Sequence, residues 1–154
     1  MSRRVILMRH AKSGWDDASL SDRQRPLNLR GRKDAPRMAS ALAELQWIPD
    51  RIVVSDSRRT LETLEFMRDV LGVVAVETRS ELYHPTVPVI QEVIESSRND
   101  ETLMILTHNP ATELIVHEMT GEYHPMPTAA CALFIEQNNA WVCQKVLRPK
   151  ELRE

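Results

Sequence analysis

The sequence contains no long hydrophobic run and no excess of positive charge. Its 154 residues include 20 Lys and Arg against 22 Asp and Glu, which gives a formal net charge of −2 at pH 7. Nucleic-acid-binding proteins usually show a strongly basic balance, so this class is disfavoured. The segment before Arg9 has too few apolar residues for a signal peptide, and no run reaches the length of a bilayer span. We therefore expect a cytoplasmic protein without nucleic-acid or membrane partners.

Cysteine and glycine are also scarce, which excludes several kinds of catalytic site. Neither Cys131 nor Cys143 is followed by arginine at the spacing of a cysteine-based phosphatase, and their apolar surroundings favour small buried side chains. The four glycines stand singly, so neither G-x-x-x-x-G-K-S/T nor G-x-G-x-x-G occurs. H-E-x-x-H and paired-cysteine spacings are missing too. We expect no metal and no cofactor.

Three short apolar runs, residues 5–8, 51–54 and 103–107, predict buried strands. Their lack of polar alternation is typical of a parallel sheet that is covered on both faces. Apolar stripes at helical spacing lie between and after these runs, in segments 38–45, 61–71, 87–94 and 111–120. Strands that alternate with helices predict an α/β fold.

The ends of these elements carry recognisable signals. Gly72 and Gly121 follow two of the helical stripes, at the position that favours a left-handed residue. Asn109 is the predicted N-cap of the last helix, with Pro110 at its first position. Pro36 lies inside the first helical stripe, so that helix either starts near Pro36 or is kinked there.

Two β-rich stretches, 130–135 and 140–146, predict a hairpin near the end of the chain. The length suits one compact domain with a substantial core. We therefore predict a single domain, residues 1–154, built as a three-layer α/β/α sandwich. Its central sheet is expected to be mostly parallel, with an antiparallel edge.

Polar side chains follow three of the predicted strands, where open α/β sheets bind their ligands. Arg9 and His10 end the first run, Arg59 starts the helix after the second, and His108 follows the third. A cation in the first turn of a helix opposes the helix dipole, so Arg59 requires a compensating anion. Each residue alone is more often structural or solvated. Together they predict one pocket for an anion.

Five segments, in order, resemble motifs of the histidine phosphatase superfamily, and in particular its SixA-type phosphohistidine phosphatases. They are LMRHAKSGW (7–15), RPLNLRGRKDAPRMA (25–39), VVSDSRRTLETLE (53–65), ILTHNP (105–110) and PMPTAA (125–130). The resemblance covers the whole chain and implies a phosphoglycerate mutase-like fold. It also implies that His10 is the nucleophile and that Arg9, Arg59 and His108 surround the phosphoryl oxygens. The spacing from Ser55 selects Arg59 over Arg58.

The chain departs from the pattern of this family at three places. Ala11 replaces a glycine, a modest change if the backbone keeps a negative φ. Asp16 stands where mutase relatives carry an asparagine, and a carboxylate there would repel phosphate. No acidic residue is clearly placed to protonate a leaving group; Glu81 is the best candidate, although an exposed glutamate is commoner.

The missing acid favours phosphohistidine on a protein as the substrate, because an imidazole departs with less help than an alkoxide. A histidine-containing phosphotransfer protein would fit, and phosphate is the product. The alternatives are a small-molecule phosphomonoesterase of the same superfamily and a non-catalytic phosphoprotein-binding module. We expect a monomer.

The sequence gives weaker evidence that other polar residues belong to the site. Lys12 and Ser13 directly follow the nucleophile and are candidate substrate-binding residues. A basic segment near the predicted pocket is either a solvated face or a docking surface for an acidic phosphoprotein; it contains Arg23, Arg25, Arg30, Arg32 and Lys33. The remaining histidines show no ligand spacing and are not expected in the site: His84, His117 and His124.

Overall fold

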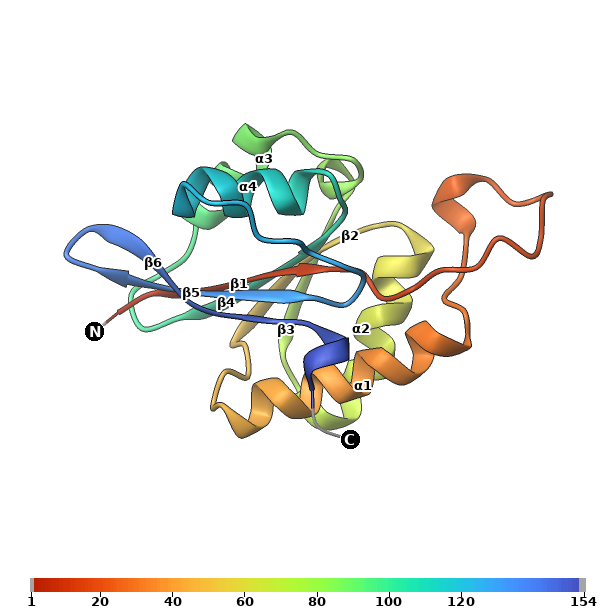
Figure 1. Cartoon of the computed structure of the whole chain (residues 1–154), viewed down its shortest axis with the longest axis horizontal. Coiled ribbons are helices and arrows are strands. Elements are labelled where there is room, and N and C mark those ends of the chain that lie inside the picture. Colours follow the sequence, from red (N-terminus) through yellow and green to blue (C-terminus); the bar gives the residue numbers. More distant parts are fainter. Residues whose placement is uncertain (1, 153–154) are drawn as a thin grey trace.

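The computed structural model describes residues 2–152 and places a six-stranded sheet between two layers of helices (Figure 1). The strands are β1 (Arg4–Arg9), β2 (Arg51–Ser55), β3 (Ala75–Arg79), β4 (Thr102–Thr107), β5 (Cys131–Gln137) and β6 (Ala140–Leu147). The main helices are α1 (Leu29–Glu44), α2 (Arg58–Leu71), α3 (Val87–Glu95) and α4 (Ala111–Thr120).

The strand order is β3-β2-β4-β1-β5-β6. The first four strands of this order pair in parallel, and β5 pairs antiparallel with both β1 and β6. Helices α1 and α2 cover one face, and α3 and α4 cover the other (Figure 1). The predicted three-layer α/β/α fold with a mostly parallel sheet and an antiparallel edge is confirmed.

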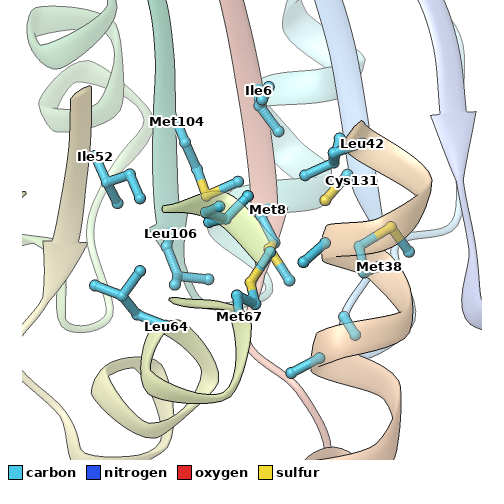
Figure 2. Packing of buried hydrophobic residues seen from close by; sticks show 14 of the residues in the cluster. Ile6, Met8, Met38, Leu42, Ile52, Leu64, Met67, Met104, Leu106 and Cys131 are labelled. Carbon is cyan, nitrogen blue, oxygen red and sulfur yellow. The ribbon is translucent and has the colours of Figure 1, made fainter. Parts of the chain in front are cut away.

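Successive residues of the inner strands face opposite hydrophobic clusters, which explains why their sequences are apolar throughout. In β1, Ile6 and Met8 pack toward α1 and α2 (Figure 2), whereas Val5 and Leu7 pack toward α3 and α4. All four are fully buried. The two helical layers therefore hold the central strands, and with them the strand ends, in fixed positions.

Some local predictions hold and others are wrong. Gly72 and Gly121 have φ of 78° and 75° directly after α2 and α4, as predicted. Helix α1 begins at Leu29, so the alternative that it starts near Pro36 is wrong. Helix α4 begins at Ala111, one residue later than predicted. Its N-cap is Pro110, so the prediction of Asn109 as the N-cap is wrong, although the Asn109 side-chain oxygen accepts a hydrogen bond from Glu113 N at 3.3 Å.

Strand β3 was not predicted from the sequence. Within residues 2–152 it pairs with β2 alone, and four of its five residues are exposed. An exposed edge strand needs no continuous apolar run, so the periodicity that identifies inner strands is missing. No helix among residues 2–152 combines the length and the apolar character that crossing a membrane requires.

The start of α1 lies against the backbone that follows His10. The Asn28 side chain accepts a hydrogen bond from Gly31 N at 2.9 Å, and Asn28 N donates to the Lys12 carbonyl at 3.0 Å. A Cβ on Gly31 would lie 2.2 Å from the Lys12 carbonyl oxygen. Glycine is therefore required here for close approach of two backbones.

Substitution of this glycine should destabilise the protein. We expect Gly31→Ala to lower the free energy of unfolding by about 2 kcal/mol, because two backbone segments must separate. Gly14→Ala is the matched control, since the nearest atom to its new Cβ is 3.7 Å away. Urea denaturation of both variants measures the difference. Equal free energies of unfolding for the two variants would show that α1 and the Lys12 backbone can separate without a loss of stability.

Candidate active site

A pocket of about 240 Å³ lies beyond the carboxyl ends of β1 and β4, beside the start of α2. Its lining residues come from several distant segments: Arg9, His10, Lys12, Ser13, Trp15, Asp22, Arg25, Arg59, His84, His108, Asn109 and Thr128. The structure thus brings all four predicted catalytic residues together. The two candidate substrate-binding residues, Lys12 and Ser13, line the same pocket.

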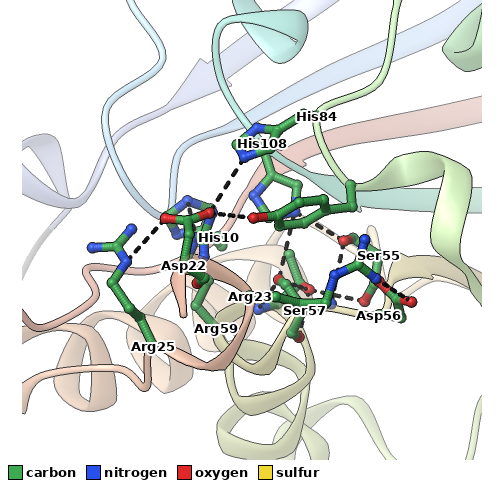
Figure 3. Close-up of polar contacts among 12 residues, drawn as sticks. His10, Asp22, Arg23, Arg25, Ser55, Asp56, Ser57, Arg59, His84 and His108 are labelled. Carbon is green, nitrogen blue, oxygen red and sulfur yellow. Dashed lines mark hydrogen bonds and ion pairs between the residues drawn. The ribbon is translucent and has the colours of Figure 1, made fainter. Parts of the chain in front are cut away.

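His10 is buried directly after β1 and has a defined tautomer. Its Nδ1 lies 2.7 Å from the Ala11 carbonyl oxygen, which can only accept, so Nδ1 carries the proton. Its Nε2 accepts a hydrogen bond from Arg59 Nε at 3.3 Å, so this nitrogen holds the lone pair (Figure 3). Ala11 is not among the residues with positive φ, so the backbone accommodates alanine there.

The environment of His10 keeps its ring neutral. Burial lowers the pKa of His10 to about 3; the hydrogen bond to Ala11 opposes this shift, and the charges of Arg59, Arg9 and Arg25 reinforce it. A neutral imidazole with its lone pair on Nε2 is the form that can attack phosphorus.

His108 lies beside His10 at the end of β4. The two ring centroids are 5.3 Å apart, and His108 Nε2 lies 2.9 Å from Ser55 Oγ at the end of β2. Burial lowers the pKa of His108 to about 2; the neighbouring His10, Arg59 and His84 act in the same direction, and Asp22 opposes them. Three strand ends therefore converge as the sequence predicted.

Arg59 is almost fully buried in the first turn of α2. Its Nη1 donates to the Asp22 carbonyl at 2.6 Å, and its Nη2 donates to Asp22 Oδ2 at 3.0 Å. The anion that a cation at this helix terminus requires is thus supplied by Asp22. Arg9 donates from Nη1 to the Met126 carbonyl at 3.2 Å. Arg58 instead pairs with Glu62 on the exposed side of α2, so the choice of Arg59 agrees with the geometry.

Asp22 is a pocket residue that sequence reasoning missed. Its carboxylate accepts hydrogen bonds from Arg59, from Arg25 Nε at 3.1 Å and from the Tyr83 hydroxyl, and it lies 3.3 Å from His84 Nε2. Burial alone would raise the pKa of Asp22, but the hydrogen bonds from Tyr83 and Arg59 and the charge of Arg59 outweigh it and hold the pKa well below its usual range. The signal was available, since Asp22 is the sole acid in DRQRPLNLRGRK.

His84 corrects a further expectation. It lines the pocket, and its ring centroid is 5.4 Å from that of His108, so the prediction that it stands apart from the site is wrong. No spacing motif identifies it, because its place depends on the turn that carries Tyr83 and His84 to Asp22. The acid candidate Glu81 is exposed and does not line the pocket, and neither does Asp16.

The basic segment divides into separate groups. Arg25 is buried in the pocket lining, with its guanidinium 3.4 Å from the centre of the Trp15 ring. Arg23 pairs with Asp56 at 2.5 Å and lies over Tyr83. Arg30 and Arg32 line a neighbouring hollow, and Lys33 is exposed on α1. Of the five basic residues, Arg25 lines the pocket and the other four lie outside it.

Three pocket residues retain buried nitrogen atoms that have no hydrogen-bond partner within residues 2–152. These atoms are Arg9 Nε, Arg25 Nη1 and His108 Nδ1. A buried polar atom without a partner is rare and costs about 1–3 kcal/mol. Two of the three are guanidinium donors, which suit the oxygens of a tetrahedral anion. The pocket is therefore suited to a phosphoryl group.

The fold and the pocket define an α/β protein whose pocket is lined by two buried histidines and several arginines, a lining that suits a phosphoryl group. A family model described as histidine phosphatase superfamily (branch 1) matches residues 5–84. An uncharacterized chloroplastic protein of Arabidopsis thaliana is 34% identical over 152 residues, covering 92% of this chain and 70% of the relative. The chain therefore belongs to the histidine phosphatase superfamily.

Solved structures place it within that superfamily. A protein assigned as the phosphohistidine phosphatase SixA of Agrobacterium tumefaciens superimposes with a TM-score of 0.85 at 26% identity, covering 95% of this chain and 97% of that one. The protein histidine phosphatase SixA in complex with tungstate gives 0.84 at 26% identity, covering 97% and 99%. The chain is of the SixA type and has the phosphoglycerate mutase-like fold, and these relatives support a phosphatase activity.

Burial of two neutral histidines predicts a loss of stability in acid. A free histidine has a pKa of 6.5, whereas His10 and His108 in the fold have values of about 3 and about 2. Below pH 6.5 the unfolded chain binds more protons, so the free energy of unfolding should decrease as pH falls. The decrease amounts to at most about 1.4 kcal/mol per pH unit for each histidine.

We expect His10→Gln to remove about half of the decrease in the free energy of unfolding that acid causes. Urea denaturation at pH 6.5 and pH 4.5 should show a decrease about 2.5 kcal/mol smaller in His10→Gln than in the wild type. His117→Gln, an exposed position on α4, is the control and should retain the wild-type decrease. The same pH dependence in all three proteins would contradict the neutral state of His10.

Proposed function

We propose that this protein hydrolyses phosphohistidine on a protein substrate through a phosphohistidine intermediate on His10. One observation carries the proposal: His10 Nδ1 is held by the Ala11 carbonyl, so the Nε2 lone pair faces a pocket lined by Arg9, Arg59 and His108. The solved relative with bound tungstate, a tetrahedral oxyanion like phosphate, supports a phosphoryl site in this fold.

The reaction divides into two displacements. In the first, the His10 Nε2 lone pair forms a bond to phosphorus, and the bond from phosphorus to the leaving nitrogen breaks with its electron pair on that nitrogen. In the second, a water oxygen forms a bond to phosphorus and its proton leaves toward the solvent side of the pocket, while the electron pair of the N–P bond returns to Nε2. Arg9, Arg59 and His108 stabilise the equatorial oxygens throughout, a task that needs positioned charge and hydrogen bonds.

The acidic residues near the pocket favour imidazole as the leaving group. Asp22 is held ionised by Arg59 and Tyr83, and Glu81 does not line the pocket, so neither carboxyl group is placed to protonate an alkoxide. An imidazole departs with less assistance than an alkoxide does. A phosphorylated histidine, as on a histidine-containing phosphotransfer protein, is therefore the substrate class that we propose.

The substrate class is tested by comparing two phosphoryl donors. The purified protein should release phosphate from a phosphorylated histidine-containing transfer protein at least about 100-fold faster than from 3-phosphoglycerate, because the latter leaves as an alkoxide. Phosphate release under matched concentrations measures the ratio. Equal or reversed rates would refute the substrate class and favour a small-molecule phosphomonoesterase.

The intermediate is tested by acid-base stability of the bound label. After brief exposure to ³²P-labelled phosphohistidine substrate and a denaturing quench, the enzyme should carry a phosphoryl group that is stable in base and labile in acid. His10→Ala should carry none, and His117→Ala, an exposed position on α4, should label as the wild type does. Binding of the substrate without any label on the wild-type protein would instead indicate a non-catalytic phosphoprotein-binding module.

A further inference from the structure

The geometry points to His84 as the proton donor to the leaving group, with Asp22 as the residue that positions it. This inference rests on attack by His10, as proposed above, but not on the identity of the natural substrate. The preference for phosphohistidine is retained with this donor, because an alkoxide is a far more basic leaving group than an imidazole or a phenolate. His84 lies at the pocket that contains His10 and His108, and its Nε2 is 3.3 Å from Asp22 Oδ2 (Figure 3).

The direction of the reaction places the leaving group near His84. His10 is only 6% exposed and forms the buried floor of the pocket, whereas the His84 side chain is 53% exposed. An in-line displacement requires the leaving atom to lie opposite the nucleophile. The remainder of a protein substrate must also stay outside the pocket. Both conditions direct the leaving atom toward the open side, where His84 lies.

The surroundings hold the His84 ring in a defined place. It packs against Tyr83, with ring centroids 4.2 Å apart, and it faces His108 at 5.4 Å. Tyr83 in turn hydrogen-bonds Asp22, and the guanidiniums of Arg23 and Arg59 lie 4.1 and 5.9 Å from the Tyr83 ring centre. The His84 backbone has a φ of 47°, a conformation that a non-glycine residue adopts only when its surroundings support it.

The other lining residues are less suited to proton transfer. The guanidiniums of Arg9, Arg25 and Arg59 do not give up protons in water, and the Asp22 carboxylate has none to give. His10 and His108 are buried and neutral. Lys12 is exposed, and an ammonium is a weak acid near neutral pH. Imidazole is the side chain most often used for proton transfer, and that of His84 has a carboxylate oxygen 3.3 Å from its Nε2.

The proton balance of the two steps is complete. As His10 Nε2 bonds to phosphorus, the electron pair of the breaking bond stays on the leaving nitrogen or oxygen. The proton on Nδ1 of the charged His84 ring passes to that atom, while the Nε2 proton stays on the side of Asp22. Neutral His84 then takes a proton from the attacking water as the N–P bond to His10 breaks. His84 is again charged, and the Asp22 carboxylate is unchanged.

Leaving groups of different acidity test this role directly. Phenyl phosphate needs a proton on its leaving oxygen, whereas 2,4-dinitrophenyl phosphate does not. His84→Asn should slow phosphorylation of His10 by phenyl phosphate about 100-fold or more, and by the dinitrophenyl ester less than about threefold. Asparagine is chosen because it tolerates positive φ as histidine does. Single turnovers with enzyme in excess measure both rates.

Two controls and one rescue accompany the test. His117→Asn, on the exposed face of α4, should change neither rate. Lys12→Met should show no selective loss on phenyl phosphate; a selective loss there instead of in His84→Asn would assign the donor to Lys12 and overturn the inference. Free imidazole should restore phenyl phosphate turnover in His84→Ala, because the site of the ring is open to solvent.

The remaining outcomes separate this inference from the proposed function. Equal losses on the two esters in His84→Asn, or no loss on either, would overturn the role of His84 while leaving His10 as the nucleophile. A wild-type enzyme that labels on His10 from phosphohistidine but reacts with neither ester would also overturn it. A wild-type enzyme that never labels on His10 would refute the proposed function itself.

Discussion

The hydrogen bond from His10 Nδ1 to the Ala11 carbonyl governs the chemistry available to this site, because it leaves the lone pair of the ring on Nε2. Hydrogen bonds to residues of α2 hold the loop that provides this carbonyl. Ala11 N donates to Thr63 Oγ1 at 2.9 Å, and the Thr63 hydroxyl donates to the Arg59 carbonyl at 2.7 Å. Helix α2 thus controls both the tautomer of His10 and the guanidinium beside it.

The electrostatics of the pocket follow from the same helix. Arg59 adds a buried positive charge to a helix terminus that is already electropositive, an arrangement that is stable only beside negative charge. Asp22 meets this need in the present structure through two contacts with the guanidinium. A phosphoryl group is a second anion that suits the same position, so its binding and the contacts of Asp22 are linked.

How much of this arrangement the sequence could predict depends on where each residue lies. Arg9, His10 and His108 follow inner strands, whose apolar runs are easily recognised, so the rule that ligands bind at carboxyl strand ends located them correctly. Arg59 could also be predicted, because a cation in the first turn of a helix opposes the helix dipole. The α/β class of the fold was predicted from the same pattern, in which apolar runs typical of strands alternate with apolar stripes at helical spacing.

Asp22 and His84 escaped prediction for a physical reason. Both lie in loops, where side-chain position is set by contacts such as that between Tyr83 and Asp22 and not by a periodic pattern. Strand β3 escaped for a related reason, since an exposed edge lacks the apolar run of an inner strand. Tertiary contacts, and not local propensity, decide these parts of the molecule.

The contact between Gly31 and the Lys12 backbone connects the packing of the hydrophobic core to the position of His10. Helix α1 is packed on the sheet through Met38 and Leu42, far from any phosphoryl group, yet its first turn supports the segment that leaves His10. A shift of α1 along the sheet would therefore reach His10 through main-chain atoms, without a side chain to absorb it. The packing of α1 in the core and the position of His10 are therefore coupled in this protein.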